Sequence, residues 1–162
     1  MSNCFYANFF SIDIIFLYKK IPLPPVYFIM QNCYCCSGKN FEECCKSILE
    51  GSRKAGTAEE LMRSRYSAYA AALIEYLMKT THSATRKFYD AKAIESWAIS
   101  SKWIQLEIVK TEKGMSDDFE GFVEFKATYQ DKEGKIIVHH ENSHFLKEKG
   151  EWFFLEGKVR KS

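Results

Sequence analysis

Five cysteines within thirteen residues constrain the fold of this chain more than any other feature of its sequence. They form two clusters, with a turn-forming Ser37-Gly38 step between them. The cysteines are Cys33, Cys35, Cys36, Cys44 and Cys45. Four thiolates make a closed tetrahedral site for Zn²⁺. A hairpin this short has no adequate core without an ion, so we expect its folding to be coupled to metal binding.

The expected ligands are Cys33 and Cys35 from one arm, and Cys44 and Cys45 from the other. Cys36 competes as a ligand because it lies next to Cys35. Three alternatives stay open at this point: reduced thiols without metal, disulfides in an exported protein, and another metal such as iron. Clustered cysteines favour metal binding in a reducing compartment over a disulfide framework, so we expect a cytoplasmic protein with Zn²⁺ as its cofactor.

Composition limits the remaining classes of function. The chain of 162 residues is 46% hydrophobic and 15% aromatic, which is enough for one packed domain and a small appendage. Its net charge of +2 comes from 23 basic and 21 acidic residues that are well mixed. A duplex-DNA binder usually has a basic face. The hairpin is itself nearly neutral, so we expect no nucleic-acid partner.

The first 29 residues differ from the rest of the chain. An apolar run at 9–18 is followed by Lys19-Lys20 and three prolines. A secretory signal places its positive charge before the apolar run, and a membrane-spanning helix needs about 20 apolar residues. Two interpretations remain: a tail that associates with a membrane or a partner, or translation that starts at Met30, which makes residues 1–29 non-native. We expect no membrane association unless this extension is real.

The rest of the chain has a helical pattern followed by an alternating one. Thr57 and Glu60 form a capping box, and the helical pattern continues to about Thr80. A second helix is expected at 87–101. Strands are expected at 102–111, 119–130, 135–147 and 152–158, joined by short turns. Helices before an antiparallel meander indicate an α+β domain at 55–160 that follows a zinc hairpin at 30–50. A strongly curved sheet wrapped around one long helix is the natural packing.

Two stretches of the sequence resemble known families. The pattern C-x-C-x-S-G-x-x-F-x-x-C-C of residues 33–45 is similar to the SEC-C motif, the zinc hairpin at the C-terminus of the SecA translocation ATPase. Cys36 departs from it, because the family usually has glycine there. The stretch TAEELMRSRYSAY at 57–69 resembles the signature of the YchJ family, as do His140-Glu141-x-Ser143-x-Phe145, Trp152 and Gly157.

The resemblance implies a SEC-C hairpin joined to a nuclear-transport-factor-2-like domain, a cone-shaped α+β fold with an internal cavity. It also implies Zn²⁺ at the cysteines. In SecA the related hairpin contacts the export chaperone SecB, so the resemblance suggests a protein partner for the hairpin. Domains of this fold include enzymes and non-catalytic proteins, so the fold alone does not decide the function.

A polar step within an apolar strand marks a candidate pocket. With period two, His139, Glu141 and Ser143 share a face with apolar neighbours, so Glu141 can point inward beside Arg65 or Tyr69. The candidate pocket residues are Arg65, Tyr69, Trp97 and Glu141. Glu141 is expected to form a buried ion pair with Arg65; unpaired, it is a candidate general acid or base with a raised pKa, and simple exposure is the third alternative.

The sequence assigns no catalytic residues, since it contains neither a nucleophile–base–orienter set nor a phosphate-binding glycine loop. We therefore expect a non-enzymatic interaction or adaptor module with a structural zinc hairpin. The alternative is an enzyme or small-ligand binder that uses the cavity of the α+β domain.

Overall fold

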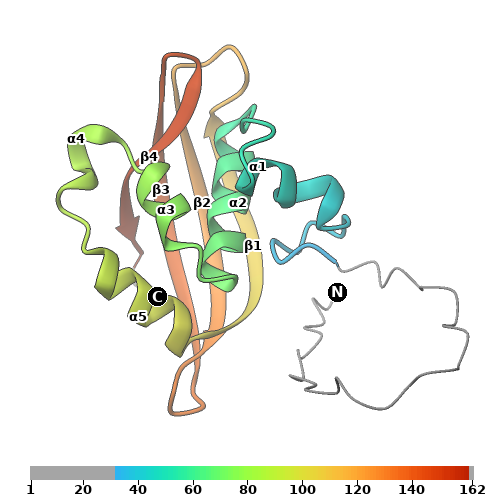
Figure 1. Cartoon of the computed structure of the whole chain (residues 1–162), viewed down its shortest axis with the longest axis vertical. Coiled ribbons are helices and arrows are strands. Elements are labelled where there is room, and N and C mark those ends of the chain that lie inside the picture. The colour runs from blue at the N-terminus through green and yellow to red at the C-terminus, as the bar shows by residue number, and fades with distance from the viewer. Residues whose placement is uncertain (1–31, 161–162) are drawn as a thin grey trace, which may run out of the picture.

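A computed structural model describes residues 32–160 of the chain. The expectations for residues 1–29, including the choice between Met1 and Met30 as the start, lie outside these residues. The described part is an α+β structure in which helices lie against a long antiparallel sheet, as Figure 1 shows. The longest of its helices has 13 residues, and none between 32 and 160 is long and apolar enough to cross a membrane.

Four strands form a meander, in the order expected from the alternating pattern. They are β1 (Lys102–Lys113), β2 (Glu120–Gln130), β3 (Ile136–Glu148) and β4 (Glu151–Val159). Each pairs antiparallel with the next, so β1 and β4 are the edges of an open sheet. The alternation of β2 is confirmed, with Val123, Phe125 and Ala127 buried. The open sheet does not confirm the expected cone shape.

The expectation of one long helix up to about Thr80 is wrong, because this segment forms two helices. Helix α2 (Ala58–Ala70) ends at Ala71, and α3 (Ile74–Lys79) follows after a turn. Ala72 adopts a left-handed conformation with φ 52°, and its N–H and that of Leu73 donate to Tyr69 O and Ala68 O. This is a Schellman ending. It turns α3 back onto α2, where Leu77 is fully buried and Tyr76 Oη lies 2.6 Å from Ser64 Oγ. These contacts offset the energetic cost of the left-handed conformation at Ala72, which has a Cβ.

The second expected helix begins later than its pattern indicated. A short α4 (Ser83–Arg86) comes first, and α5 (Ala91–Ser100) begins after Asp90, whose carboxylate accepts from Lys92 N. Phe88, within the expected range 87–101, therefore lies before α5, and 75% of it is exposed. Trp97, on α5, packs against the rings of Tyr69 and Trp103.

Helix α2 is the centre of the core. Thr57 caps its N-terminus as predicted, with Oγ1 accepting from Glu60 N at 3.1 Å, but the Glu60 carboxylate accepts from Gly56 N at 2.7 Å instead of from Thr57 N. The helix packs on β1, β2 and β4 through apolar side chains. The largest fully buried side chains of the core, on α2 and on the elements around it, are Leu61, Tyr66, Leu77, Val123 and Phe145.

One close approach positions α2 on the sheet. Gly114, at φ 81°, closes the turn between β1 and β2, and its carbonyl accepts from Ala58 N at 2.9 Å. A Cβ added to Gly121 would lie 2.4 Å from Gly114 Cα and 3.0 Å from Ala58 Cβ. Only glycine therefore fits at position 121, and the start of α2 lies directly against the turn.

Candidate metal centre and adjacent pocket

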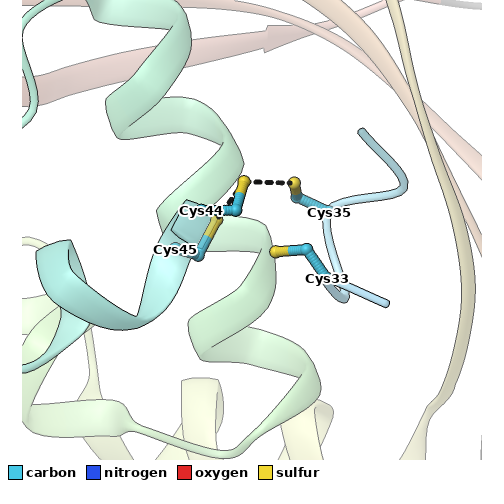
Figure 2. Close-up of side chains that lie close together, drawn as sticks. All are labelled: Cys33, Cys35, Cys44 and Cys45. Atoms are coloured by element: carbon cyan, nitrogen blue, oxygen red, sulfur yellow. Dashed lines mark hydrogen bonds between the residues drawn. The ribbon is translucent and has the colours of Figure 1, made fainter. Parts of the chain in front are cut away.

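Four cysteine sulfurs converge beside α2. Cys33 and Cys35 lie in the loop that begins the described chain, and Cys44 and Cys45 lie in a short π-helix, η1 (Glu42–Lys46), which continues into α1 (Ser47–Leu49). Figure 2 shows the four side chains pointing toward one another. All four Sγ atoms lie within 4.8 Å of one another. The Cys44 sulfur is 3.6 Å from that of Cys35 and 3.9 Å from that of Cys45.

These distances suit a tetrahedral tetrathiolate site. A Zn–S bond of about 2.3 Å in a tetrahedron separates neighbouring sulfurs by about 3.8 Å. The side chains of Cys33, Cys35 and Cys45 are buried, with at most 1% of each residue exposed, whereas Cys44 is partly exposed. The donor set therefore fits Zn²⁺ and supplies all four ligands. That these cysteines hold a metal, and which metal, stays a prediction.

The thiols interact strongly with one another. The pKa of Cys33 is raised to about 11, chiefly because its thiol donates to Cys35. The pKa of Cys35 is lowered by hydrogen bonds from Cys33 and Cys45, while the hydrogen bonds to Cys33 and Cys35, together with burial, raise that of Cys45. Burial and hydrogen bonds among the thiols thus keep protons within the cluster. A divalent cation would replace those protons, so metal uptake would release them.

Side chains of helix α2 contact the cysteine cluster. Arg63 Nη1 donates to Cys35 O at 3.1 Å while its Nε donates to Glu59 at 2.8 Å. Burial lowers the pKa of Arg63, but the Glu59 carboxylate outweighs it and the net pKa is raised. Ser67 Oγ lies 3.9 Å from Cys33 Sγ, and Ser37 Oγ 3.4 Å from Cys44 Sγ. The periodicity of α2 did not identify Arg63 as part of this site, since its pattern is that of a solvated helix arginine.

Cys36 lies outside the group of four sulfurs. Its φ of 56° is the left-handed conformation that the usual glycine would favour, and its Sγ lies 3.4 Å from Tyr34 O. A non-glycine residue in this conformation costs about 1 kcal/mol. Cys36 thus lies in the turn between the two arms, and its exclusion from the ligand set stays a prediction.

A pocket of about 520 Å³ lies on the other side of α2. All four predicted residues line it: Arg65, Tyr69, Trp97 and Glu141. Its wall is aromatic. The ring centroids of Tyr69, Trp97 and Trp103 lie 5.2 to 5.3 Å apart, and the His139 ring lies 5.6 Å from that of Trp97. Sequence periodicity missed Trp103 and Tyr89, which also line the pocket and which no local motif marks.

The expected ion pair between Glu141 and Arg65 is wrong. Glu141 Oε2 lies 2.8 Å from His139 Nε2, and its Oε1 accepts from Ser143 Oγ at 2.5 Å. Burial raises the pKa of Glu141, but the hydrogen bonds from His139 and Ser143 outweigh it, so the net pKa is lowered. The raised pKa of a general acid or base is therefore also wrong. Strand alternation did predict that these three side chains share one face. The hydrogen bonds to the Glu141 carboxylate, however, come from residues on β3 and not from Arg65 on α2.

Arg65 is buried with its charge facing the pocket. Its Nη1 donates to Leu77 O at 2.8 Å and to Thr80 Oγ1 at 2.7 Å, and its Cζ lies 4.5 Å above the Phe154 ring. No carboxylate of residues 32–160 lies within ion-pair distance of it. Burial lowers its pKa, which measures the cost of keeping this cation away from water.

The sequence of the α+β part identifies the family. A family model described as the YchJ middle domain, with a nuclear-transport-factor-2-like fold, matches residues 57–157. The chain belongs to the YchJ family. A UPF0225 protein of Geobacter sulfurreducens is 48% identical over 125 residues, which are 77% of each chain. A UPF0225 protein of Vibrio cholerae is 37% identical over 127 residues, 78% of this chain and 82% of that one.

Two solved structures have the same architecture as this YchJ-family chain. A SEC-C motif containing protein from Rhodopseudomonas palustris matches with a TM-score of 0.74 and 35% identity, covering 81% of this chain and all of that one. A SEC-C motif containing protein from Psychrobacter arcticus matches with a TM-score of 0.65 and 36% identity, covering 78% of this chain and 76% of that one. The two resemblances seen in the sequence, SEC-C and YchJ, are confirmed together.

Proposed function

We propose that this protein carries a structural Zn²⁺ in its hairpin and acts as a non-enzymatic interaction module. The arrangement of four sulfurs within 4.8 Å of one another carries the first half of the proposal. Four thiolates fill a tetrahedral coordination shell, and a shell without an open position favours structure over catalysis. Reduced thiols are needed for this role, which supports a cytoplasmic location.

The second half rests on charges beside the metal centre. A polar groove of about 470 Å³ runs between the hairpin and the start of α2. Arg53 and Arg63, which line it, are already paired with Glu60 and Glu59. Two other lining residues, Lys39 and Glu43, form no ion pair with any residue in the described range 32–160. Two unpaired charges of opposite sign suit a polar segment of a partner protein that also carries both signs.

Metal content tests the first half directly. The protein purified without added metal should contain one Zn²⁺ per chain by mass spectrometry of the native protein. Cys44→Ser should lose the ion and melt at a lower temperature, because metal binding and hairpin folding are coupled. Cys36→Ser, whose sulfur lies outside the group of four, should keep it. Protein without stoichiometric metal, or equal metal loss in both variants, would contradict the assignment.

A pair of matched variants tests the docking role. The double variant Lys39→Ala/Glu43→Ala removes both unpaired charges of the groove and leaves the four sulfurs in place. Lys132→Ala/Glu133→Ala removes two exposed charges from the turn between β2 and β3 and serves as control. A protein captured by the wild type and the control, but lost with the zinc-loaded groove variant, would support docking. Identical captured proteins with all three would refute it.

A further inference from the structure

The pocket on the other side of α2 contains hydrogen-bond donors that have no acceptor in the described part of the chain. Only 6% of Arg65 is exposed, and its hydrogen bonds within residues 32–160 all run from Nη1. Within residues 32–160, Nε and Nη2 of this guanidinium have no hydrogen-bond acceptor, and Arg65 lines the pocket. A buried cation with free donors is costly unless something accepts from them.

Two tyrosines add donors near the same guanidinium. Tyr69 and Tyr89 line the pocket, and both lie close enough to Arg65 for their charges to interact. Neither hydroxyl has a hydrogen-bond partner in the described part of the chain, whereas the hydroxyl of Tyr76 is taken by Ser64. Arg65, Tyr69 and Tyr89 together form a group of donors with no acceptor between them. Such a group is suited to an anionic oxygen group.

A carboxylate in the pocket lining limits the charge of that group. Glu141 is held by His139 and Ser143, and its charge interacts with Arg65, Tyr69 and Tyr89. One guanidinium facing one carboxylate leaves the pocket nearly neutral. A dianion such as a phosphate monoester would be repelled by Glu141 with only a single cation to hold it. A monoanion is the better match.

The walls specify what the anionic group is attached to. Trp97, Trp103 and Phe154 give the pocket flat apolar surfaces, and its volume of about 520 Å³ lies within the range of small-molecule sites. Aromatic walls alone would also suit an organic cation, but the Glu141 carboxylate is already taken by His139 and Ser143, whereas the donors of Arg65, Tyr69 and Tyr89 call for an acceptor.

We propose that this pocket binds a small monocarboxylic acid with an aromatic or apolar body. Its carboxylate accepts from Arg65 and from the hydroxyls of Tyr69 and Tyr89, and its body packs against Trp97 and Trp103. The site is independent of the docking role of the hairpin, and neither proposal depends on the other.

A panel of small acids tests the site with the full, zinc-loaded chain. The probes are benzoate, phenylacetate, indole-3-acetate and octanoate, each with its matched neutral amide, and phenyltrimethylammonium as the cation. Calorimetry should detect at least one acid with Kd of about 0.1 to 1 mM, the range for a fragment of this size. The matched amide should bind at least about ten times more weakly, because a neutral group gains less from a buried guanidinium.

Variants and an internal reporter locate the binding. Tyr69→Phe and Tyr89→Phe remove only hydroxyls with no hydrogen-bond partner among residues 32–160, so both should fold and each should weaken the acid about five-fold, in line with one lost hydrogen bond. Tyr129→Phe, whose residue lies outside the pocket lining, should bind normally. The acid should shift the NMR signal of the Trp97 indole but not that of Trp152, whose indole donates to Gly56 O.

Three results would each overturn the proposal. The first is that none of the four acids binds saturably below about 10 mM. The second is that amides or the cation bind as well as the acids. The third is that binding is unchanged in both tyrosine variants. Zinc content measured for every variant separates these results from any change at the hairpin.

Discussion

Gly157 tests how tightly Glu141 is held in the pocket wall. It lies on β4 directly opposite Ser143, and a Cβ added to it would meet three atoms of a single side chain. The added carbon would lie 2.1 Å from Oε1, 2.3 Å from Cδ and 2.8 Å from Oε2 of Glu141. In Gly157→Ala the carboxylate must therefore leave its place and give up its hydrogen bonds from His139 and Ser143.

The cost follows from those two bonds. Hydrogen bonds to a charged group contribute about 1.5 to 3 kcal/mol each. The displaced carboxylate regains part of this from water in the pocket, and alanine is favoured over glycine in a strand by about 0.5 to 1 kcal/mol. We expect Gly157→Ala to lower the free energy of unfolding by about 2 to 3 kcal/mol. In the Glu141→Ala background the clash is gone, and the same change should raise stability by about 0.5 to 1 kcal/mol.

Urea unfolding of the zinc-loaded protein, followed by circular dichroism, measures all four members of this cycle. The reasoning predicts a change of sign and a coupling energy of about 3 kcal/mol between the two positions. An equal cost of Gly157→Ala in both backgrounds would show that the clash lies with the backbone and not with the carboxylate. A neutral effect in the wild type would show that Glu141 moves freely.

Three further predictions concern the fold and its dependence on pH. Gly121→Ala forces a Cβ onto the Gly114 backbone, so calorimetry should show a loss of about 3 kcal/mol, or about 10 °C in melting temperature; an unchanged melting temperature would refute the close approach. Thr57→Ala should cost about 1 kcal/mol in urea unfolding, and Thr57→Ser, which keeps the cap, much less. Because the folded pKa of Glu141 is lowered, its contribution is complete above the unfolded value of about 4.3 and is lost as pH falls through the folded one. The stability difference between wild type and Glu141→Gln should therefore shrink from pH 7 to pH 3, and a constant difference would contradict this.

Local patterns predicted what depends on local chemistry. The sulfur cluster follows from the spacing of Cys33, Cys35, Cys44 and Cys45 around one turn, and the four strands follow from alternation on one buried face. The helix cap at Thr57 could be predicted from two residues alone, Thr57 and Glu60 three positions later.

The end of α2 and the partners of Glu141 could not be predicted from local sequence patterns, because tertiary contacts determine both. Ala70 to Ala72 contain no helix breaker, and the helix ends there only because Tyr76 and Leu77 gain partners by folding back onto α2. The partner of Glu141 was also beyond the pattern. Alternation places a side chain on a face but does not say whether a residue on the same strand or one on a helix reaches it first.

The position of α2 has a thermodynamic consequence. One face of this helix contacts the metal centre through Arg63 and Ser67, and another lines the pocket through Arg65 and Tyr69. A pocket ligand that stabilises this helix in its present position would raise the affinity of the cysteines for a metal ion, and the ion would raise the affinity for that ligand by the same factor. The proposed metal site and the proposed pocket would then be linked in their binding equilibria, while each could still fill without the other.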